Sequence, residues 1–95
     1  MRVVASKVHA LHILVKTEPE ANEILFDLRR GADFGGVAKA RSICPSAKKG
    51  GDLGCFGRNQ MVKEFETLAF SLPVNELGKC KTEFGWHVVK VVETK

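Results

Sequence analysis

The segment Val8-His-Ala-Leu-His-Ile-Leu-Val15 determines the architecture of this chain, because both of its alternating faces are apolar apart from the histidines. Successive side chains of a β-strand point to opposite faces of a sheet. A strand with two apolar faces is covered on both sides. The segment is therefore predicted to be a central strand, with the His12 imidazole buried and hydrogen-bonded.

A second strand is predicted from Trp86 to Glu93, where β-branched residues dominate and His87 follows the tryptophan. If the two strands are neighbours in the sheet, His12 and His87 lie side by side. We then expect the two rings to hydrogen-bond to each other through matched tautomers. Taken alone, a histidine in an apolar run is more often a hydrogen-bonded core residue than a reactive group, so both interpretations stay open here.

Two helices are predicted after the first strand. Thr17-Glu-Pro-Glu20 has the spacing of a capping box, and apolar residues follow at helical spacing up to a terminating Gly31. Asp33 can cap a shorter helix in which Phe34, Val37 and Ala38 share one face. Residues 42–51 are basic and rich in turn-forming residues, so this segment is predicted to be a loop.

The stretch from Cys44 to Phe65, CPSAKKGGDLGCFGRNQMVKEF, is the most informative about a binding site. It predicts a short strand over 52–57 and a helix that Asn59 caps and that runs to about residue 72. Met61 and Phe65 stand four residues apart on this predicted helix and share its apolar stripe. Such a pair can hold an apolar ring or simply pack in the core, and the pattern alone favours the core.

Pro73 is expected to end this helix, and residues 79–83 are expected to form an edge strand after a turn. The predicted order is strand, helix, helix, turn, strand, helix, strand, strand. It indicates an α+β domain in which helices pack on a small mixed or antiparallel sheet. A chain of 95 residues makes one domain, residues 1–95, with one core.

The composition argues against several classes of function. A hydrophobic fraction of 44% and a charged fraction of 27% are ordinary for a soluble globular protein, and a core of this modest size leaves little room for a large cofactor. The net charge of +4 comes from small basic pairs among carboxylates, so nucleic acid is not a favoured partner. No apolar run approaches the roughly 18 residues that a membrane span needs, and no membrane partner is expected.

Three cysteines, Cys44, Cys55 and Cys80, occur without a Cys-x-x-Cys spacing, so neither a disulfide framework nor a zinc site is predicted. The N-terminus lacks the apolar core of a signal peptide, and a reduced, cytoplasmic location is the expectation. His9 and His12 are three residues apart on the first strand and fall on opposite faces. We therefore expect no metal ion and no other cofactor.

A series of short motifs resembles the parvulins, one of the families of peptidyl-prolyl cis/trans isomerases. The motifs are His-Ile-Leu-Val at 12–15, Gly-Ala-Asp-Phe at 31–34, Ala-Lys-x-x-Ser at 38–42, Cys-Pro-Ser at 44–46, Gly-Gly-Asp-Leu-Gly at 50–54, Gln-Met-Val at 60–62, Phe65, and Phe-Gly-Trp-His at 84–87. The resemblance covers about residues 9–93 in the right order. It is greatest to the short, single-domain bacterial parvulins.

The resemblance implies an FKBP-like fold, a four-stranded antiparallel sheet surrounded by about four helices in the order β-α3-β-α-β2. It also implies that His12 and His87 are the paired histidines, that Cys44 is the active-site thiol, and that the Thr82 hydroxyl hydrogen-bonds into the histidine network. The substrate-binding residues implied are Leu53, Met61, Phe65, Gln60 and Phe84.

Two departures separate this chain from phosphate-directed parvulins, which carry a long basic loop after the first strand. Here Val15-Lys-Thr-Glu18 leads directly into the helix, and its acidic end would repel a phosphate. Ile43 also stands where those enzymes tend to place an acid. We therefore expect no requirement for a phosphorylated residue before the proline.

The leading hypothesis is a monomeric, cofactor-free isomerase that acts on X-Pro bonds of unfolded or flexible polypeptides by non-covalent stabilisation of the twisted imide. A covalent role for Cys44 is not expected, because the chain offers no protease signature around this residue. The alternative is a peptide-binding chaperone module with little turnover. A basic nucleic-acid-binding domain is a less favoured alternative.

Overall fold

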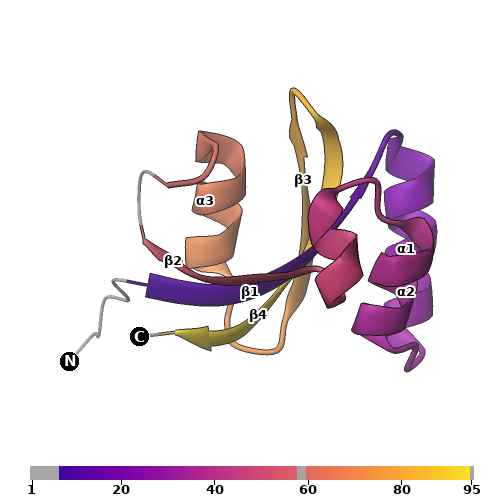
Figure 1. Ribbon diagram of the computed structural model, residues 1–95, viewed down its shortest axis with the longest axis horizontal. Helices are drawn as coiled ribbons and strands as arrows, with labels where there is room; N and C mark the ends of the chain where they lie inside the picture. Colours follow the sequence, from indigo (N-terminus) through magenta and orange to yellow (C-terminus); the bar gives the residue numbers. More distant parts are fainter. Residues whose placement is uncertain (1–6, 58–59, 95) are drawn as a thin grey trace.

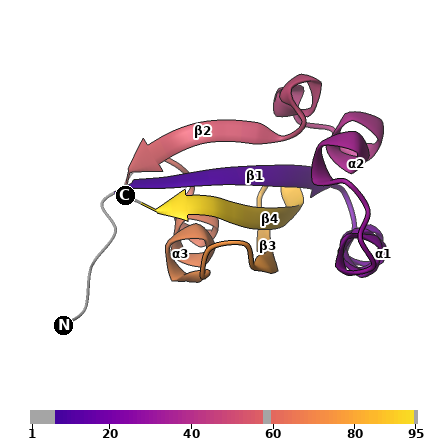
Figure 2. The same cartoon turned by 90° about the horizontal axis from the view of Figure 1, so that it is seen from below.

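The computed structural model describes residues 7–57 and 60–94, which form a four-stranded antiparallel sheet with helices packed against it (Figure 1). The elements are β1 Lys7–Val15, α1 Glu18–Arg29, α2 Phe34–Arg41, the 3-10 helix η1 Pro45–Lys49, β2 Asp52–Gly57, α3 Lys63–Ser71, β3 Leu77–Thr82 and β4 Gly85–Thr94. Figure 2 shows the strands one below another in the order β2, β1, β4, β3.

Strand β1 lies in the middle of the sheet, as its two apolar faces predict, between β2 and β4. In the antiparallel pairing of β1 with β4, His12 stands opposite Val89 and Leu14 stands opposite His87. The two histidines are therefore diagonal neighbours on adjacent strands, at the distance at which long side chains meet.

The sheet separates two apolar cores. Val88 packs with Ile13 and with residues of α1 and α2, whereas the next residue, Val89, packs with Phe65 of α3. Because consecutive strand residues point to opposite faces, α1 and α2 cover one face and α3 covers the other. Figure 1 shows α1 and α2 together at one end of the sheet and α3 at the opposite end.

The predicted starts of α1 and α2 are confirmed. Thr17 Oγ1 accepts the Glu20 N–H at 3.4 Å and donates to Glu20 Oε1 at 2.9 Å, and Gly31 follows α1 with a φ of 106°. Asp33 Oδ2 accepts the Gly36 N–H at 2.8 Å at the start of α2. These side chains satisfy backbone donors that have no partner within the helix.

The third helix begins later than predicted. Val62 is its extended N-cap residue and Lys63 its first residue, so Met61 precedes α3, and the prediction that Met61 and Phe65 share one helix is wrong. Glu64 in the first turn favours this start, because its charge complements the positive end of the helix dipole. The capping residue predicted at position 59 lies outside the described residues.

Two smaller predictions also change. The edge strand β3 begins at Leu77, two residues before the predicted start, because the turn before it closes at Glu76, whose N–H donates to the Pro73 carbonyl at 3.1 Å. The predicted loop contains η1, so the described residues hold three α-helices and one 3-10 helix around the sheet. Across residues 7–57 and 60–94, the helices are too short or too polar to span a bilayer.

A glycine is required where the loop after η1 passes β1. Gly51 has a φ of 83°, and a Cβ atom built on it would lie 2.3 Å from the His12 carbonyl oxygen. The Gly51 carbonyl in turn accepts the His12 N–H at 2.9 Å. This close approach holds the backbone of His12 in place. Only glycine permits it, because glycine adopts a positive φ readily and has no Cβ to collide with the carbonyl oxygen.

Candidate active site

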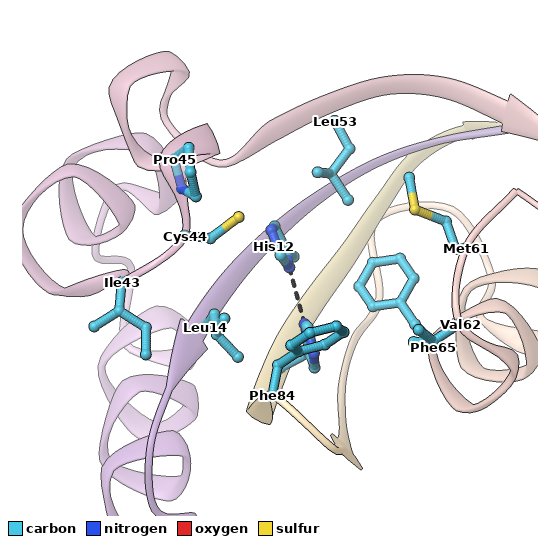
Figure 3. Close-up of a pocket in the computed structure, with 11 residues that line it drawn as sticks. His12, Leu14, Ile43, Cys44, Pro45, Leu53, Met61, Val62, Phe65 and Phe84 are labelled. Carbon is cyan, nitrogen blue, oxygen red and sulfur yellow. Dashed lines mark hydrogen bonds between the residues drawn. The ribbon is translucent and has the colours of Figure 1, made fainter.

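A pocket of about 360 Å³ opens between α3 on one side and the segment before η1 on the other (Figure 3). Met61 and Phe65 lie on the α3 side, and Ile43 and Cys44 lie across from them. The lining side chains are those of His12, Leu14, Ile43, Cys44, Pro45, Leu53, Met61, Val62, Phe65, Phe84 and His87. None of these lining residues is Lys, Arg, Asp or Glu, so the pocket wall holds no permanently charged side chain.

The floor of the pocket is a pair of buried, hydrogen-bonded histidines, as the sequence predicts. His12 Nδ1 and His87 Nδ1 are 3.0 Å apart, and each residue is 5% exposed. The rings stack with an interplanar angle of 18°. Beyond the pair, His87 Nε2 lies 2.8 Å from Thr82 Oγ1, the hydroxyl position that the resemblance implied.

The other end of this hydrogen-bond chain reaches the thiol. His12 Nε2 lies 3.0 Å from Ser46 Oγ, and the Ser46 hydroxyl donates to Cys44 Sγ at 3.3 Å. Sequence reasoning assigned no role to Ser46. The sequence feature that could have identified Ser46 is the Cys-Pro-Ser motif, because a hydroxyl two residues after the cysteine falls on the first turn of η1.

The donors in the chain run in one direction. The Phe84 N–H donates to Thr82 Oγ1 at 3.1 Å, so the Thr82 hydroxyl proton is directed to His87 Nε2. His87 then carries its proton on Nδ1 and donates to His12, whose Nε2–H donates to Ser46. The reverse direction would leave the buried Thr82 proton without an acceptor among the described residues, which is costly.

Both imidazoles are neutral at neutral pH. Burial, and then the neighbouring His87 ring, lowers the pKa of His12 from 6.5 to about 4. Burial also lowers the pKa of His87. The pair is thus an uncharged support, because removal from water disfavours the protonated form of each ring.

Phe65 joins the floor to the wall. Its ring meets His12 edge-on at a centroid distance of 5.5 Å and His87 at 5.3 Å, and it is 2% exposed. Met61, from the loop before α3, and Leu53, from β2, complete an apolar wall around it. The structure therefore brings together Leu53, Met61 and Phe65 as the resemblance implied, although Met61 arrives from a loop.

Two further residues implied as substrate-binding have different positions. Phe84 lines the pocket and is 58% exposed, so its ring lies at the rim. Gln60 is not among the lining residues, and its Oε1 instead accepts the Gly57 N–H at 3.0 Å.

Sequence reasoning did not assign Leu14 or Ile43 to the pocket. They are brought there by the Ile43 N–H bond to the Leu14 carbonyl at 2.9 Å.

Comparisons with known proteins agree with this geometry. Residues 1–95 match the PPIC-type PPIase domain. The chain is 48% identical over 89 residues to the foldase protein PrsA of Geobacillus kaustophilus, which covers 92% of this chain and 32% of that protein. The structure of PrsA from Bacillus anthracis has a TM-score of 0.93 at 38% identity, covering 97% of this chain and 43% of that one.

A much shorter protein is also similar. NmPin, the parvulin of Nitrosopumilus maritimus, has a TM-score of 0.86 at 44% identity, and the match covers 94% of this chain and 98% of NmPin. In contrast, this chain spans about a third of the length of the curated relatives that it matches first. With the family match over its whole length and the paired histidines beneath an apolar pocket, the chain belongs to the parvulins, the PPIC-type peptidyl-prolyl isomerase domains.

Proposed function

We propose that this chain accelerates cis/trans rotation about X-Pro bonds in unfolded or flexible polypeptides. The observation that carries the proposal is the apolar pocket of about 360 Å³ with the neutral histidine pair as its floor. A proline ring is apolar, and Leu53, Met61 and Phe65 offer it dispersion contacts and removal from water. The name of the relative PrsA, a foldase, supports unfolded polypeptides as the substrate class.

The mechanism needs no covalent bond to form or break. Rotation must overcome amide resonance, with a barrier of roughly 18–20 kcal/mol. The planar imide is more polar and better solvated than the twisted one, so an apolar, water-excluding pocket favours the twisted form. Each 1.36 kcal/mol of this preference gives about a tenfold increase in rate.

The hydrogen-bond chain keeps the floor of the pocket in one geometry. Every internal member from Thr82 to Ser46 is both donor and acceptor, so no ring nitrogen of the pair is free to hydrogen-bond to water. The protein contacts are therefore in place before the substrate arrives, which limits the reorganisation needed during rotation.

We further propose that catalysis is independent of phosphate. The lining residues include no Lys or Arg, and the rim carries the exposed side chains of Ile43 and Phe84. A dianionic group held there would lose water without gaining an ion pair. An apolar side chain before the proline would instead be partly buried against Ile43 and Phe84.

A panel of short peptides that differ only in the residue before proline tests this specificity. We expect kcat/KM to be about tenfold higher for Leu-Pro than for phosphoserine-Pro, because partial burial of a leucine contributes on the order of 1.5 kcal/mol. The rates are measured by a protease-coupled assay, with exchange NMR as a check that no protease step limits them. A higher rate on the phosphorylated peptide would refute phosphate independence, and binding without acceleration of any peptide would assign the chain as a peptide-binding module.

Cys44→Ser tests the non-covalent mechanism. We expect the variant to keep kcat/KM within about tenfold of the parent, because a hydroxyl still accepts the Ser46 hydrogen bond. Cys80→Ser is the matched control, since Cys80 lies outside the pocket. Burial, and then Glu64, raises the pKa of that thiol to about 11. Complete loss of activity in Cys44→Ser with a native circular dichroism spectrum would favour a covalent role.

A cytoplasmic location and a monomeric state stay predictions. The first is supported by three free cysteines, of which Cys55 is exposed and would be open to oxidation outside a reducing compartment.

A further inference from the structure

A second cluster of reactive side chains lies outside the pocket, on the three neighbouring strands β2, β1 and β4. His9, Cys55 and Glu93 each offer one atom able to ligate a metal, and these three atoms lie within 4.8 Å of one another. His9 stands directly opposite Cys55 in β2 and directly opposite Glu93 in β4. None of the three lines the pocket, so the cluster is separate from the proposed isomerase site.

A bulge in β4 turns Glu93 toward this cluster. The partner of His9 is Glu93, whereas the partner of the next residue, Ala10, is Val91, so β4 has one extra residue at Val92. An extra residue reverses the side-chain alternation beyond it. Val91 consequently packs in the core beneath α3, while Glu93 leaves that face and joins His9.

A second bulge lies in β2, on the other side of His9. His9 pairs with Cys55 and Leu11 pairs with Asp52, so two residues along β1 correspond to three residues along β2. Gly54 supplies the left-handed backbone of this bulge, with a φ of 72°. The bulge brings Asp52 to the histidine, and its Oδ1 lies 2.7 Å from His9 Nε2.

The Asp52 carboxylate holds the imidazole in a defined tautomer. Its Oδ1 also accepts the Gly54 N–H at 2.8 Å, which fixes the carboxylate in place. Donation from His9 Nε2–H to Asp52 leaves Nδ1 as a lone-pair donor. A histidine that ligates a metal commonly gives its other N–H to a carboxylate in this way.

We propose that His9, Cys55 and Glu93 bind a divalent transition metal ion, with Zn²⁺ the foremost candidate, and that Asp52 positions the imidazole. One nitrogen, one sulfur and one carboxylate oxygen form a donor set that suits a borderline-soft ion and disfavours Ca²⁺ and Mg²⁺. Cys55 and Glu93 are exposed, so the ion is reached from solvent and keeps a coordination position for water. The sequence-based expectation of no metal site is revised by this proposal.

The three ligands come from different strands and are far apart in the sequence. The unfolded chain does not hold them together, so the metal binds the folded state preferentially and stabilises it. The ion would join β2, β1 and β4 at the end of the sheet remote from α1 and α2 (Figure 2).

A Co²⁺ titration of the reduced chain tests the site, because a cysteine thiolate bound to Co²⁺ gives a charge-transfer absorption band in the near ultraviolet. We expect the band to saturate at one equivalent in the parent and in Cys44→Ser/Cys80→Ser, and to be absent in Cys55→Ser. His9→Ala and Glu93→Gln should keep a native fold and bind Co²⁺ at least tenfold more weakly. Asp52→Asn should weaken binding by roughly 10–100-fold while keeping the band position.

Thermal unfolding with Zn²⁺ provides a second readout that does not depend on spectroscopy of the thiolate. Zn²⁺ should raise the Tm of the parent and of Cys44→Ser/Cys80→Ser, and leave the Tm of Cys55→Ser unchanged. The proposal is overturned if the parent shows no band, or if the band persists in Cys55→Ser and disappears with Cys44.

Discussion

Phe65→Ala is expected to lower the free energy of unfolding by about 3–5 kcal/mol and to abolish measurable isomerase activity. The Phe65 side chain is 2% exposed, and its ring contacts both histidines edge-on. Truncation leaves a cavity between α3 and the sheet and opens the pocket floor to water. Urea unfolding and a peptide isomerisation assay measure the two effects.

The activity and stability effects are separated by milder variants. Phe65→Leu keeps most of the volume, and we expect it to lower kcat/KM by about tenfold at a temperature where the variant remains folded. Phe56→Leu is the matched control, since Phe56 is 3% exposed in the same core and 5.9 Å from Phe65 but does not line the pocket. It should lose stability to a similar degree and keep its kcat/KM. Equal kcat/KM values for the two variants would contradict the assignment of Phe65 as a substrate contact.

Acidification from pH 7 to pH 5 is expected to destabilise the folded chain by roughly 2 kcal/mol through His12 alone. The pKa of His12 is about 4 in the folded state and 6.5 in the unfolded chain. Above pH 6.5 the ring is neutral in both states, and the folded state has its full stability. As the pH falls from 6.5 towards 4, the unfolded chain binds a proton that the folded chain does not, so stability decreases.

Urea unfolding at intervals between pH 5 and pH 7 measures this slope, a range chosen to limit the contribution of carboxylates. His87 adds to the slope, because burial also lowers its pKa. His12→Gln should have a clearly shallower slope than the parent, whereas Phe56→Leu, which changes a buried residue outside the pocket without removing a titrating group, should keep the parental slope. A parental slope in His12→Gln would show that the histidine pair is not buried in the neutral form.

Much of the candidate site was predictable from the sequence, because its strongest features are local. A histidine in an apolar run must be buried and hydrogen-bonded, and His12 and His87 satisfy this by bonding to each other. The resemblance to parvulins added Leu53, Phe65, Phe84 and Cys44, all of which line the pocket. Ser46 was missed because its hydroxyl reaches His12 only after the η1 turn has folded over β1.

The central strand and the starts of α1 and α2 could be predicted from the sequence, because burial periodicity and capping side chains are properties of neighbouring residues. Three features depend on contacts between distant segments: Met61 reaches the pocket from a loop, Gln60 turns back to Gly57, and bulges in β4 and β2 bring Glu93 and Asp52 to His9. The path of a loop and the position of a bulge depend on how the chain packs against segments that are distant in the sequence. The free energy of that packing cannot be estimated from the residues of the loop or strand alone.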